Sequence, residues 1–367
     1  MLLRETLDID VVRAAKIRIK NILSNGFPVT MSFSGGKDSL CLAGLVEELV
    51  KGGEIDPSLL TVVFIDEEAI FPCIEETVKK WRVRFLQMGC KFIWFALEVK
   101  HYSCLNMLEN DESFICWDHT KRDVWIRQPP PFAICKHPAH RGPKETYQKF
   151  LERFQKGTIA MTGVRVYESI QRLKNIARKK SNLNKLEPIF DWKDSDVWLY
   201  LKNRPDIELP EIYLFLYQTG KPVNKLRVSQ FFSIDTVSSL VNMNEYYPDL
   251  MERIQRREPN AYMVALYWDS EMFGRSTKTR RELEDRKDYK KLCYDILRNP
   301  GQLVDTPHKR ALFDNYKKRF IQWEWCFTEK MYKTFYEGIS VGDPKERKLR
   351  ALLNSIVSEA NKRKGAR

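Results

Sequence analysis

The chain has 367 residues, of which 43% are hydrophobic and 30% are charged, and this composition is typical of a soluble globular protein with a full core. No apolar run approaches the ~20 residues that a membrane-spanning helix needs. Residues 1–20 are charged and follow a helical pattern, which is unlike a signal peptide. We therefore expect a cytoplasmic protein that does not associate with a membrane.

The formal net charge of the chain is +13 at pH 7. This excess favours a polyanionic partner, either a nucleic acid or the phosphates of a nucleotide, although a generally basic surface explains it equally well. Eight cysteines are scattered along the chain without the framework of a small disulfide-rich protein. Their distribution indicates a reducing compartment.

The first predicted elements are a helix, a strand and a second helix. Apolar residues recur at helical spacing within residues 1–25, up to a stop at Asn25-Gly26. A buried strand is expected from Val29 to Phe33, followed by a short loop and an amphipathic helix from Leu40 to Leu49.

The loop between that strand and helix reads SGGKDS, from Ser34 to Ser39. Its two glycines allow the backbone N–H groups to turn inward, and the start of the helix adds free donors and the positive end of the helix dipole. Lys37 can add a positive charge, and the two serines can add hydroxyl donors. The loop therefore predicts a site for a phosphate-sized anion, although it lacks the GxxxxGK[ST] spacing of a Walker A loop.

Further strands alternate with helices. A second strand is expected within Leu60–Pro72 and ends in acidic residues, a helix follows from Cys73 to Met88, and a third strand extends from Lys91 to Val99. This alternation predicts a mostly parallel sheet with right-handed crossovers. Ligands of such sheets bind beyond the carboxyl ends of the strands, which is where Asp66 is expected to lie.

Periodicity is lost between residues 101 and 143, where tryptophan, proline, cysteine and histidine are concentrated. We interpret this stretch as an irregular insertion that covers or builds a site. The spacing of its cysteines and histidines gives a candidate zinc site, with a metal-free lid as the alternative. The candidate zinc ligands are Cys116, His119, Cys135, His137 and His140.

A fourth strand is expected within Thr158–Ser169 and leads into a basic run. Arg165 and Arg172 near its end predict a bidentate clamp for phosphate or sulfate, whereas the alternative is a surface ion pair between Arg165 and Glu168. We expect the first domain to comprise residues 26–232. Residues 233–367 are basic, rich in aromatic residues and helical in pattern, which predicts a helical accessory domain.

Three segments resemble a known family. SGGKDS resembles the PP-loop of the adenine nucleotide alpha hydrolase superfamily. IDEEAIFP is similar to the VDTGxxFP segment of phosphoadenylyl sulfate (PAPS) reductases, with Glu67 and Glu68 in place of its threonine and glycine. GVRVYESIQR is similar to the signature of PAPS reductases and the small subunit of ATP sulfurylase, at Gly163, Arg165, Glu168, Ser169 and Arg172.

Weaker similarity continues to about Phe232 and includes a Y-x3-Y-x2-G stretch that contains Tyr213. The layout is also similar to that of uncharacterised PAPS reductase-like proteins of bacteria and phages. The resemblance implies an α/β fold with a Rossmann-like parallel sheet of the PP-loop ATP pyrophosphatase type, followed by the helical C-terminal domain.

The resemblance also implies a site. ATP or PAPS would bind through its phosphates, with Mg²⁺ held by Asp38 or Asp66. The implied catalytic residues are Lys37, Asp38, Arg165 and Arg172. The implied nucleotide-binding residues are Ser34, Gly35, Gly36, Lys37, Asp38, Ser39, Asp66, Gly163, Arg165, Glu168 and Ser169.

The implied reaction is attack of an acceptor on the α-phosphorus of ATP with release of pyrophosphate, for sulfur transfer or nucleic-acid modification. The basic C-terminal region would hold a nucleic-acid acceptor, and a ParB-like protein is a candidate partner. No cysteine follows Cys326, and the ECGLH-like segment of sulfonucleotide reductases is absent. Two alternatives stay open: a PAPS reductase or sulfate adenylyltransferase, and a nucleotide-sensing regulator that acts through a partner protein without turnover.

Overall fold

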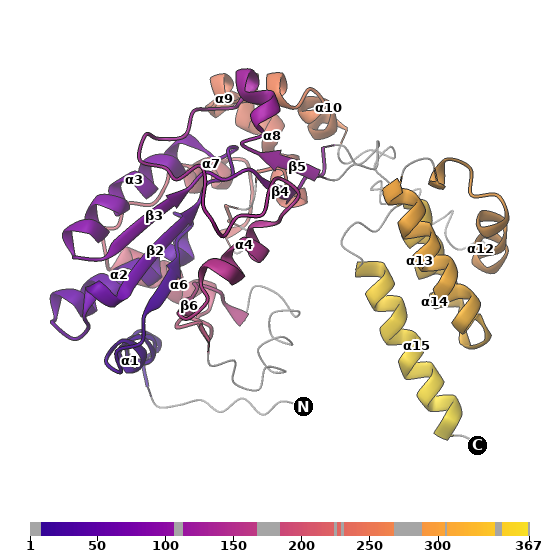
Figure 1. Cartoon of the computed structure of the whole chain (residues 1–367), viewed down its shortest axis with the longest axis horizontal. Helices are drawn as coiled ribbons and strands as arrows, with labels where there is room; N and C mark the ends of the chain where they lie inside the picture. The colour runs from indigo at the N-terminus through magenta and orange to yellow at the C-terminus, as the bar shows by residue number, and fades with distance from the viewer. Residues whose placement is uncertain are drawn as a thin grey trace. The chain divides into compact units, whose positions relative to one another are not determined.

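The computed structural model describes residues 9–105, 113–166, 184–223, 226–228, 231–267, 288–304, 307–341 and 347–365. The described residues form two compact units, and the division falls after Leu266. The elements of both units are labelled in Figure 1.

The first unit is built on a five-stranded sheet in the spatial order β3-β2-β1-β6-β7. Every neighbouring pair is parallel. The bounds are β1 (Val29–Ser32), β2 (Leu60–Ile65), β3 (Lys91–Phe95), β6 (Ile159–Met161) and β7 (Lys185–Leu186). The predicted α/β fold with a Rossmann-like parallel sheet is therefore confirmed.

The order of the strands reverses at β1. The chain goes from β1 to β2 and β3 on one side, and β6 and β7 then continue on the other side of β1. Met31 at the centre of β1 is in register with Val62 of β2 and Met161 of β6. Such a reversal leaves a crevice at the carboxyl ends of the two diverging strands. The loops after β1 and β6 therefore meet where open α/β sheets bind ligands.

Helices connect and cover these strands. The helix α2 (Lys37–Lys51) crosses from β1 to β2, and α3 (Pro72–Gln87) crosses from β2 to β3 (Figure 1). α2 is buried along most of its length, which explains its nearly continuous apolar sequence. α1 (Val11–Leu23) and α6 (Asp194–Lys202) both contact α2.

The insertion between β3 and β6 contains regular structure. β4 (Val99–Tyr102) and β5 (Ser113–Cys116) form an antiparallel ribbon, followed by the 3-10 helix η3 (His119–Val124) and by α4 (Tyr147–Phe154). The sequence predicted only irregular chain for residues 101–143, which include β5 and η3. The ribbon was missed because each of its strands is only four residues long.

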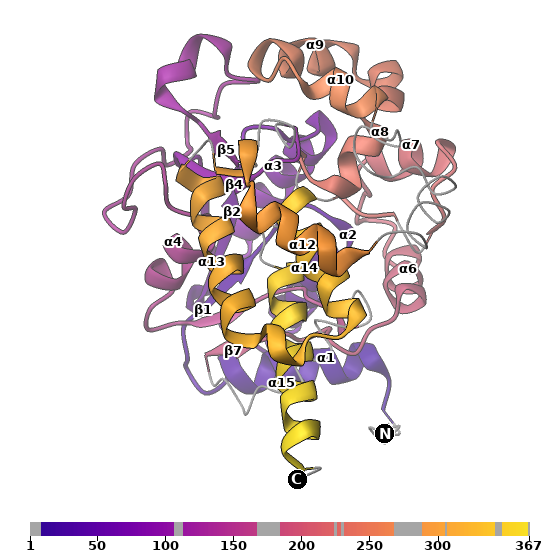
Figure 2. The same ribbon diagram turned by 90° about the vertical axis from the view of Figure 1, so that its right-hand side faces the viewer.

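Among the described residues, the first unit also contains the helices α7 (Ile212–Gln218), α8 (Ile234–Tyr246), α9 (Pro248–Arg257) and α10 (Ala261–Leu266). α8, α9 and α10 lie together in both views (Figures 1 and 2). Tyr246 and Tyr247 pack on aromatic rings of α7 and of the loop before α3. The structure therefore divides the chain after Leu266, beyond the boundary at residue 233 that the sequence led us to expect.

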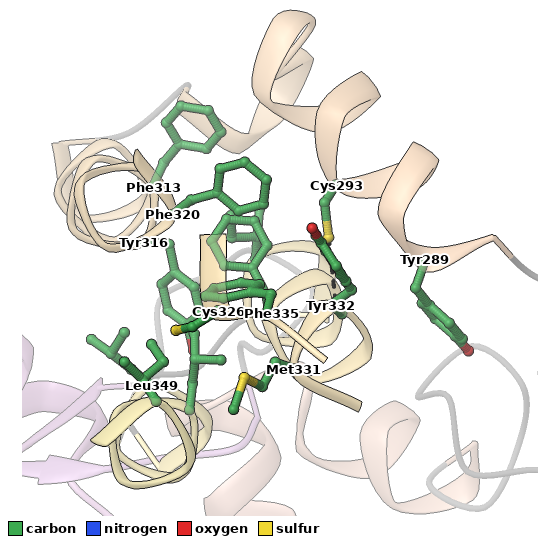
Figure 3. Close-up of a cluster of buried hydrophobic side chains, with 14 residues drawn as sticks. Tyr289, Cys293, Phe313, Tyr316, Phe320, Cys326, Met331, Tyr332, Phe335 and Leu349 are labelled. Atoms are coloured by element: carbon green, nitrogen blue, oxygen red, sulfur yellow. Dashed lines mark hydrogen bonds between the residues drawn. The ribbon is translucent and has the colours of Figure 1, made fainter. Parts of the chain in front are cut away.

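The second unit is helical, as predicted. It contains α12 (Tyr289–Arg298), η7 (Gly301–Val304), α13 (Pro307–Trp323), η8 (Glu324–Cys326), α14 (Glu329–Val341) and α15 (Arg347–Gly365). Its core is largely aromatic: Tyr316 and Phe320 of α13 point toward Phe335 of α14 (Figure 3). In the part of the chain that the structure describes, no helix is long and apolar enough to cross a bilayer.

Candidate functional site

The loop between β1 and α2 is held in a conformation that requires glycine. Gly35 has a φ of +72°, and a Cβ added there would lie 2.9 Å from Cγ2 of Val78. After β6, a Cβ on Gly163 would lie 3.2 Å from the carbonyl oxygen of Asp38. The two strand-end loops therefore touch at the reversal of the sheet, and the close neighbours at both positions leave little room for a side chain.

Hydrogen-bond donors gather at the start of α2. The N-cap residue Gly36 makes no side-chain cap. The first N–H groups of a helix lack acceptors within it and carry the positive end of its dipole. Ser39 donates its hydroxyl to the carbonyl of Gly36 at 2.9 Å, and the exposed Ser34 places its hydroxyl 3.2 Å from that of Ser39. The N–H of Gly36 in turn donates to the hydroxyl of Ser34 at 3.4 Å, so the serines and the backbone of this loop form one hydrogen-bonded cradle.

Lys37 is directed away from solvent, unlike the phosphate-contacting side chain that the sequence predicted. Only 2% of the residue is exposed, and its Nζ donates to the carbonyl oxygen of Leu226 at 3.0 Å. Burial lowers the pKa of Lys37. The backbone N–H of Lys37 donates to the hydroxyl of Tyr213 at 2.7 Å. Lys37 thus joins the loop to α7 and to the segment that follows it.

Asp38 and Arg165 form a buried ion pair at the junction of the two loops. Nε of Arg165 lies 2.7 Å from Oδ1 of Asp38, and its Nη2 donates to Oδ1 of Asp194 at 2.9 Å. The Arg165 guanidinium is fully buried, whereas a phosphate clamp needs exposed donors. The alternative, an ion pair between Arg165 and Glu168, involves a residue outside the described part of the chain. The other predicted residues of this loop, Glu168, Ser169 and Arg172, lie outside the described residues.

Asp66 and Glu68, which follow β2, are both fully buried. Oδ2 of Asp66 accepts from Nε1 of Trp94 at 2.7 Å, and its Oδ1 is paired with Arg127. Glu68 accepts from Nε of Arg257 at 3.1 Å. Burial raises the pKa of each carboxyl group, although the paired arginine opposes the rise. Both side chains therefore hold the insertion and α9 against the end of β2.

Glu68 also occupies a strained backbone position. Its φ is +62°, in the left-handed region that glycine adopts most easily. The similar PAPS reductase segment has glycine at this place. The bonds that the Glu68 carboxylate accepts from the backbone N–H groups of Trp117 and Ile126 fix this conformation.

The two carboxylates that the sequence assigned to Mg²⁺ are both engaged by cationic side chains. Asp38 contacts Arg165 and Lys37, and Asp66 contacts Arg127. A divalent cation would have to displace these partners to reach either carboxylate. The residues therefore do not fit a directly ligated Mg²⁺.

The predicted zinc site is not formed. Within the described segments, no three His, Cys, Asp or Glu side chains come together as a metal site. Cys116 is fully buried in β5, while Cys135 and His119 are exposed. His137 packs edge-on against Phe95, and His140 donates from Nε2 to the carbonyl of Glu98. His137 and His140 both pack on Phe150, but the five residues do not come together as one ligand set, so close spacing in the sequence did not produce a metal site.

Sequence reasoning missed three residues that build the site. Arg127 in the insertion and Arg257 in α9 carry no sequence motif, and the carboxylates of Asp66 and Glu68 that they neutralise lie far away in the chain. Tyr213 belongs to the Y-x3-Y-x2-G stretch, so the resemblance contained a signal for it. The ring of Tyr213 is buried, and its hydroxyl accepts a hydrogen bond from the backbone N–H of Lys37 in the loop.

Comparison with known proteins gives one family. Residues 28–234 match the family model described as "Phosphoadenosine phosphosulfate reductase domain". The uncharacterized protein YbdN of Escherichia coli (strain K12) is 28% identical over 316 residues, which cover 77% of this chain and 74% of that protein. The uncharacterized protein MJ0066 of Methanocaldococcus jannaschii is 33% identical over 187 residues, which cover 47% of this chain and 31% of that protein.

Solved structures show distant similarity. A PAPS reductase from Candida auris, in a phosphate complex, has a TM-score of 0.33 and 12% identity, and the match covers 62% of this chain and 99% of that chain. An NH3-dependent NAD synthetase from Campylobacter jejuni has a TM-score of 0.31 and 12% identity, over 69% of this chain and 96% of that chain.

Proposed function

The protein belongs to the phosphoadenosine phosphosulfate reductase domain family, and from that premise we propose that its Ser34–Ser39 loop binds the phosphates of an adenine nucleotide. One observation carries the proposal: a glycine-dependent loop and a helix N-terminus whose N-cap glycine supplies no side-chain acceptor lie together where the strand order reverses. Backbone donors at such a position favour a phosphate-bearing ligand.

The proposed reaction is adenylyl transfer from ATP. A lone pair of the acceptor forms a bond to the α-phosphorus, and the bond from that phosphorus to the bridging oxygen breaks. The electron pair leaves with pyrophosphate, whose developing charge the N–H groups of the loop and the dipole of α2 stabilise. Arg165 acts in this proposal as a positioning residue, because it holds Asp38 and the start of α6 in place.

Reduction of a sulfonucleotide by a thiol is less well supported. All eight cysteines lie in described segments, and only Cys135 is exposed. Burial raises the pKa of Cys41 and of Cys116 well above the usual range, which disfavours the thiolate. Burial also raises the pKa of Cys135. A nucleophilic thiolate needs the opposite shift.

We propose a nucleic acid as the acceptor class, because the net charge of +13 favours a polyanion. The exposed residues Lys317 and Lys318 of α13 are examples of this charge in the second unit. A ParB-like partner gains no support from the comparisons. Addition of DNA or RNA should increase pyrophosphate release if the acceptor proposal holds.

The experiment is a titration calorimetry measurement with ATP and with PAPS in magnesium buffer, together with a pyrophosphate-release assay. Ser34→Ala removes an exposed hydroxyl of the cradle, and Ser58→Ala, at another exposed serine, which lies before β2, is the matched control. A lost hydrogen bond to a charged phosphate should weaken ATP binding about tenfold in the first variant only.

The outcomes separate the alternatives. ATP binding with pyrophosphate release supports the adenylyl-transfer proposal. ATP binding without any release contradicts it and favours a nucleotide sensor. Binding of PAPS alone, with release of sulfite, would favour a reductase.

A further inference from the structure

The second unit exposes a tryptophan. Trp325, the middle residue of η8, is 55% exposed, whereas every other tryptophan that the structure describes is buried or half-buried. Four residues earlier, Ile321 of α13 is 73% exposed, the highest value among the large hydrophobic side chains of the described segments. Exposure of large apolar side chains to water is unfavourable, so two of them close together indicate a place where another molecule binds.

The backbone on both sides of Trp325 is fixed by the core of the second unit. Glu324 accepts hydrogen bonds from the hydroxyls of Tyr294, at 3.0 Å, and of Tyr332. Cys326 is fully buried and lies among the aromatic side chains of the core (Figure 3). The indole of Trp325 therefore projects from a fixed position, and little conformational entropy is lost when a ligand stacks on it.

Basic side chains accompany these two residues along α13. The helix contains five Lys or Arg residues and a single Asp. Lys317 and Lys318 are both exposed, and Lys317 lies one turn before Ile321 on the same face of the helix. Residues 267–367 contain 24 Lys and Arg against 15 Asp and Glu, so this part of the chain carries most of the net charge of +13. The charge around Ile321 and Trp325 therefore complements a polyanion.

We propose that Lys317, Lys318, Ile321 and Trp325 form a binding surface for single-stranded nucleic acid, which we call the α13 surface. A base stacks on the indole of Trp325, Ile321 packs against the same nucleotide, and the two lysines contact neighbouring phosphates. Proteins that bind single strands without sequence preference combine aromatic and basic side chains in this way. This inference rests on the nucleic-acid acceptor proposed above and names its form as a single strand.

A duplex fits the α13 surface less well than a single strand does. The faces of the bases in a duplex are covered by their neighbours, so an indole cannot stack on them unless the duplex opens. The phosphate contacts of Lys317 and Lys318 would remain, because both forms carry a charged backbone. The surface should therefore prefer single strands, and Trp325 should account for the preference.

The test measures binding of the whole chain, without ATP, to a fluorescein-labelled oligothymidylate and to a blunt-ended duplex of the same length, by fluorescence anisotropy. Trp325→Ala removes the indole, and Tyr217→Ala, at an aromatic residue of α7 that is 58% exposed, is the matched control. Loss of one base stack should weaken binding of the oligothymidylate about 5- to 150-fold in the Trp325 variant only. Trp325→Phe keeps an aromatic ring and should retain part of the affinity. Binding of the duplex should be weaker in the wild type and unchanged by Trp325→Ala.

The salt dependence of binding separates the lysines from the indole. Each phosphate contact with a single strand contributes about −0.7 to the slope of log K against log[salt]. Lys317→Gln combined with Lys318→Gln should therefore make the slope shallower by about 1.4. Lys149→Gln combined with Lys202→Gln, at exposed lysines of α4 and α6, should leave the slope unchanged. Trp325→Ala should weaken binding at every salt concentration without a change in slope.

Wild-type affinity of Trp325→Ala for the oligothymidylate would overturn the inference, and so would a duplex that binds as tightly as the single strand. Sedimentation of the wild-type chain as a dimer that Trp325→Ala dissociates would also overturn it, because the α13 surface would then bind a second copy of the chain.

The proposed adenylyl transfer can fail separately, because these measurements need neither ATP nor turnover. If no pyrophosphate is released but Trp325→Ala loses affinity for the oligothymidylate, adenylyl transfer fails and the α13 surface stands. If pyrophosphate is released and Trp325→Ala binds the oligothymidylate like the wild type, the α13 surface alone fails.

Discussion

The buried guanidinium of Arg165 makes a quantitative prediction. Arg165→Met keeps the length of the side chain and removes its charge. In the wild-type protein the guanidinium lies 2.7 Å from Asp38 and 2.9 Å from Asp194, whose side chains are 21% and 33% exposed. The variant leaves both carboxylates without this cation. Removal of one partner from a buried pair costs about 3–5 kcal/mol. Because the two carboxylates can recover some hydration, we expect about 3 kcal/mol for this variant.

Urea unfolding measures the loss, and hydrogen–deuterium exchange localises it. Faster exchange is expected in α2 and α6, the two helices that the pair joins. Arg256→Met removes an exposed ion pair with Glu252 within α9 and should cost less than about 1 kcal/mol. If Arg165→Met is as stable as Arg256→Met, the reasoning is wrong. A variant that keeps its stability but loses ATP affinity would instead support the phosphate clamp expected from the sequence.

Two further predictions concern single contacts. Tyr213→Phe removes the acceptor of the buried Lys37 N–H and should destabilise the first unit by about 1–3 kcal/mol, whereas Tyr217→Phe, on the exposed side of α7, should leave the melting temperature unchanged. Equal melting temperatures for the two variants would contradict the role of this bond. Gly338→Ala should destabilise the second unit by about 1–3 kcal/mol in thermal denaturation, because the new Cβ would lie 2.5 Å from Cζ of Tyr316. A stabilised variant would show that only the higher helix propensity of alanine matters there.

The sequence contained enough information for the sheet and the phosphate loop, because both depend on local patterns. Apolar strands alternate with amphipathic helices, and the glycines of SGGKDS mark a turn that other residues adopt with difficulty. The positive φ of Gly35 and the helix that begins at Lys37 agree with that prediction.

The orientation of the charged side chains could not be predicted in the same way. Lys37, Arg165 and Asp66 were expected to face a ligand, but each has protein partners distant in the chain, such as the Leu226 carbonyl for Lys37. Sequence spacing says which residue types lie near a strand end. It does not say which of them are neutralised by an arginine from an insertion or from a later helix.

The contacts of Arg257, the last residue of α9, determine where the chain can be divided for expression. Arg257 donates to Glu68, contacts Glu258 and reaches the carbonyl of Ile115 in β5 at 2.8 Å. A fragment that ends at Phe232 would lose this cation and leave a strained, buried carboxylate without its partner. A fragment that ends at Leu266 retains the whole contact set. The shortest useful fragment of the first unit therefore extends well beyond the last residue of the matched family domain.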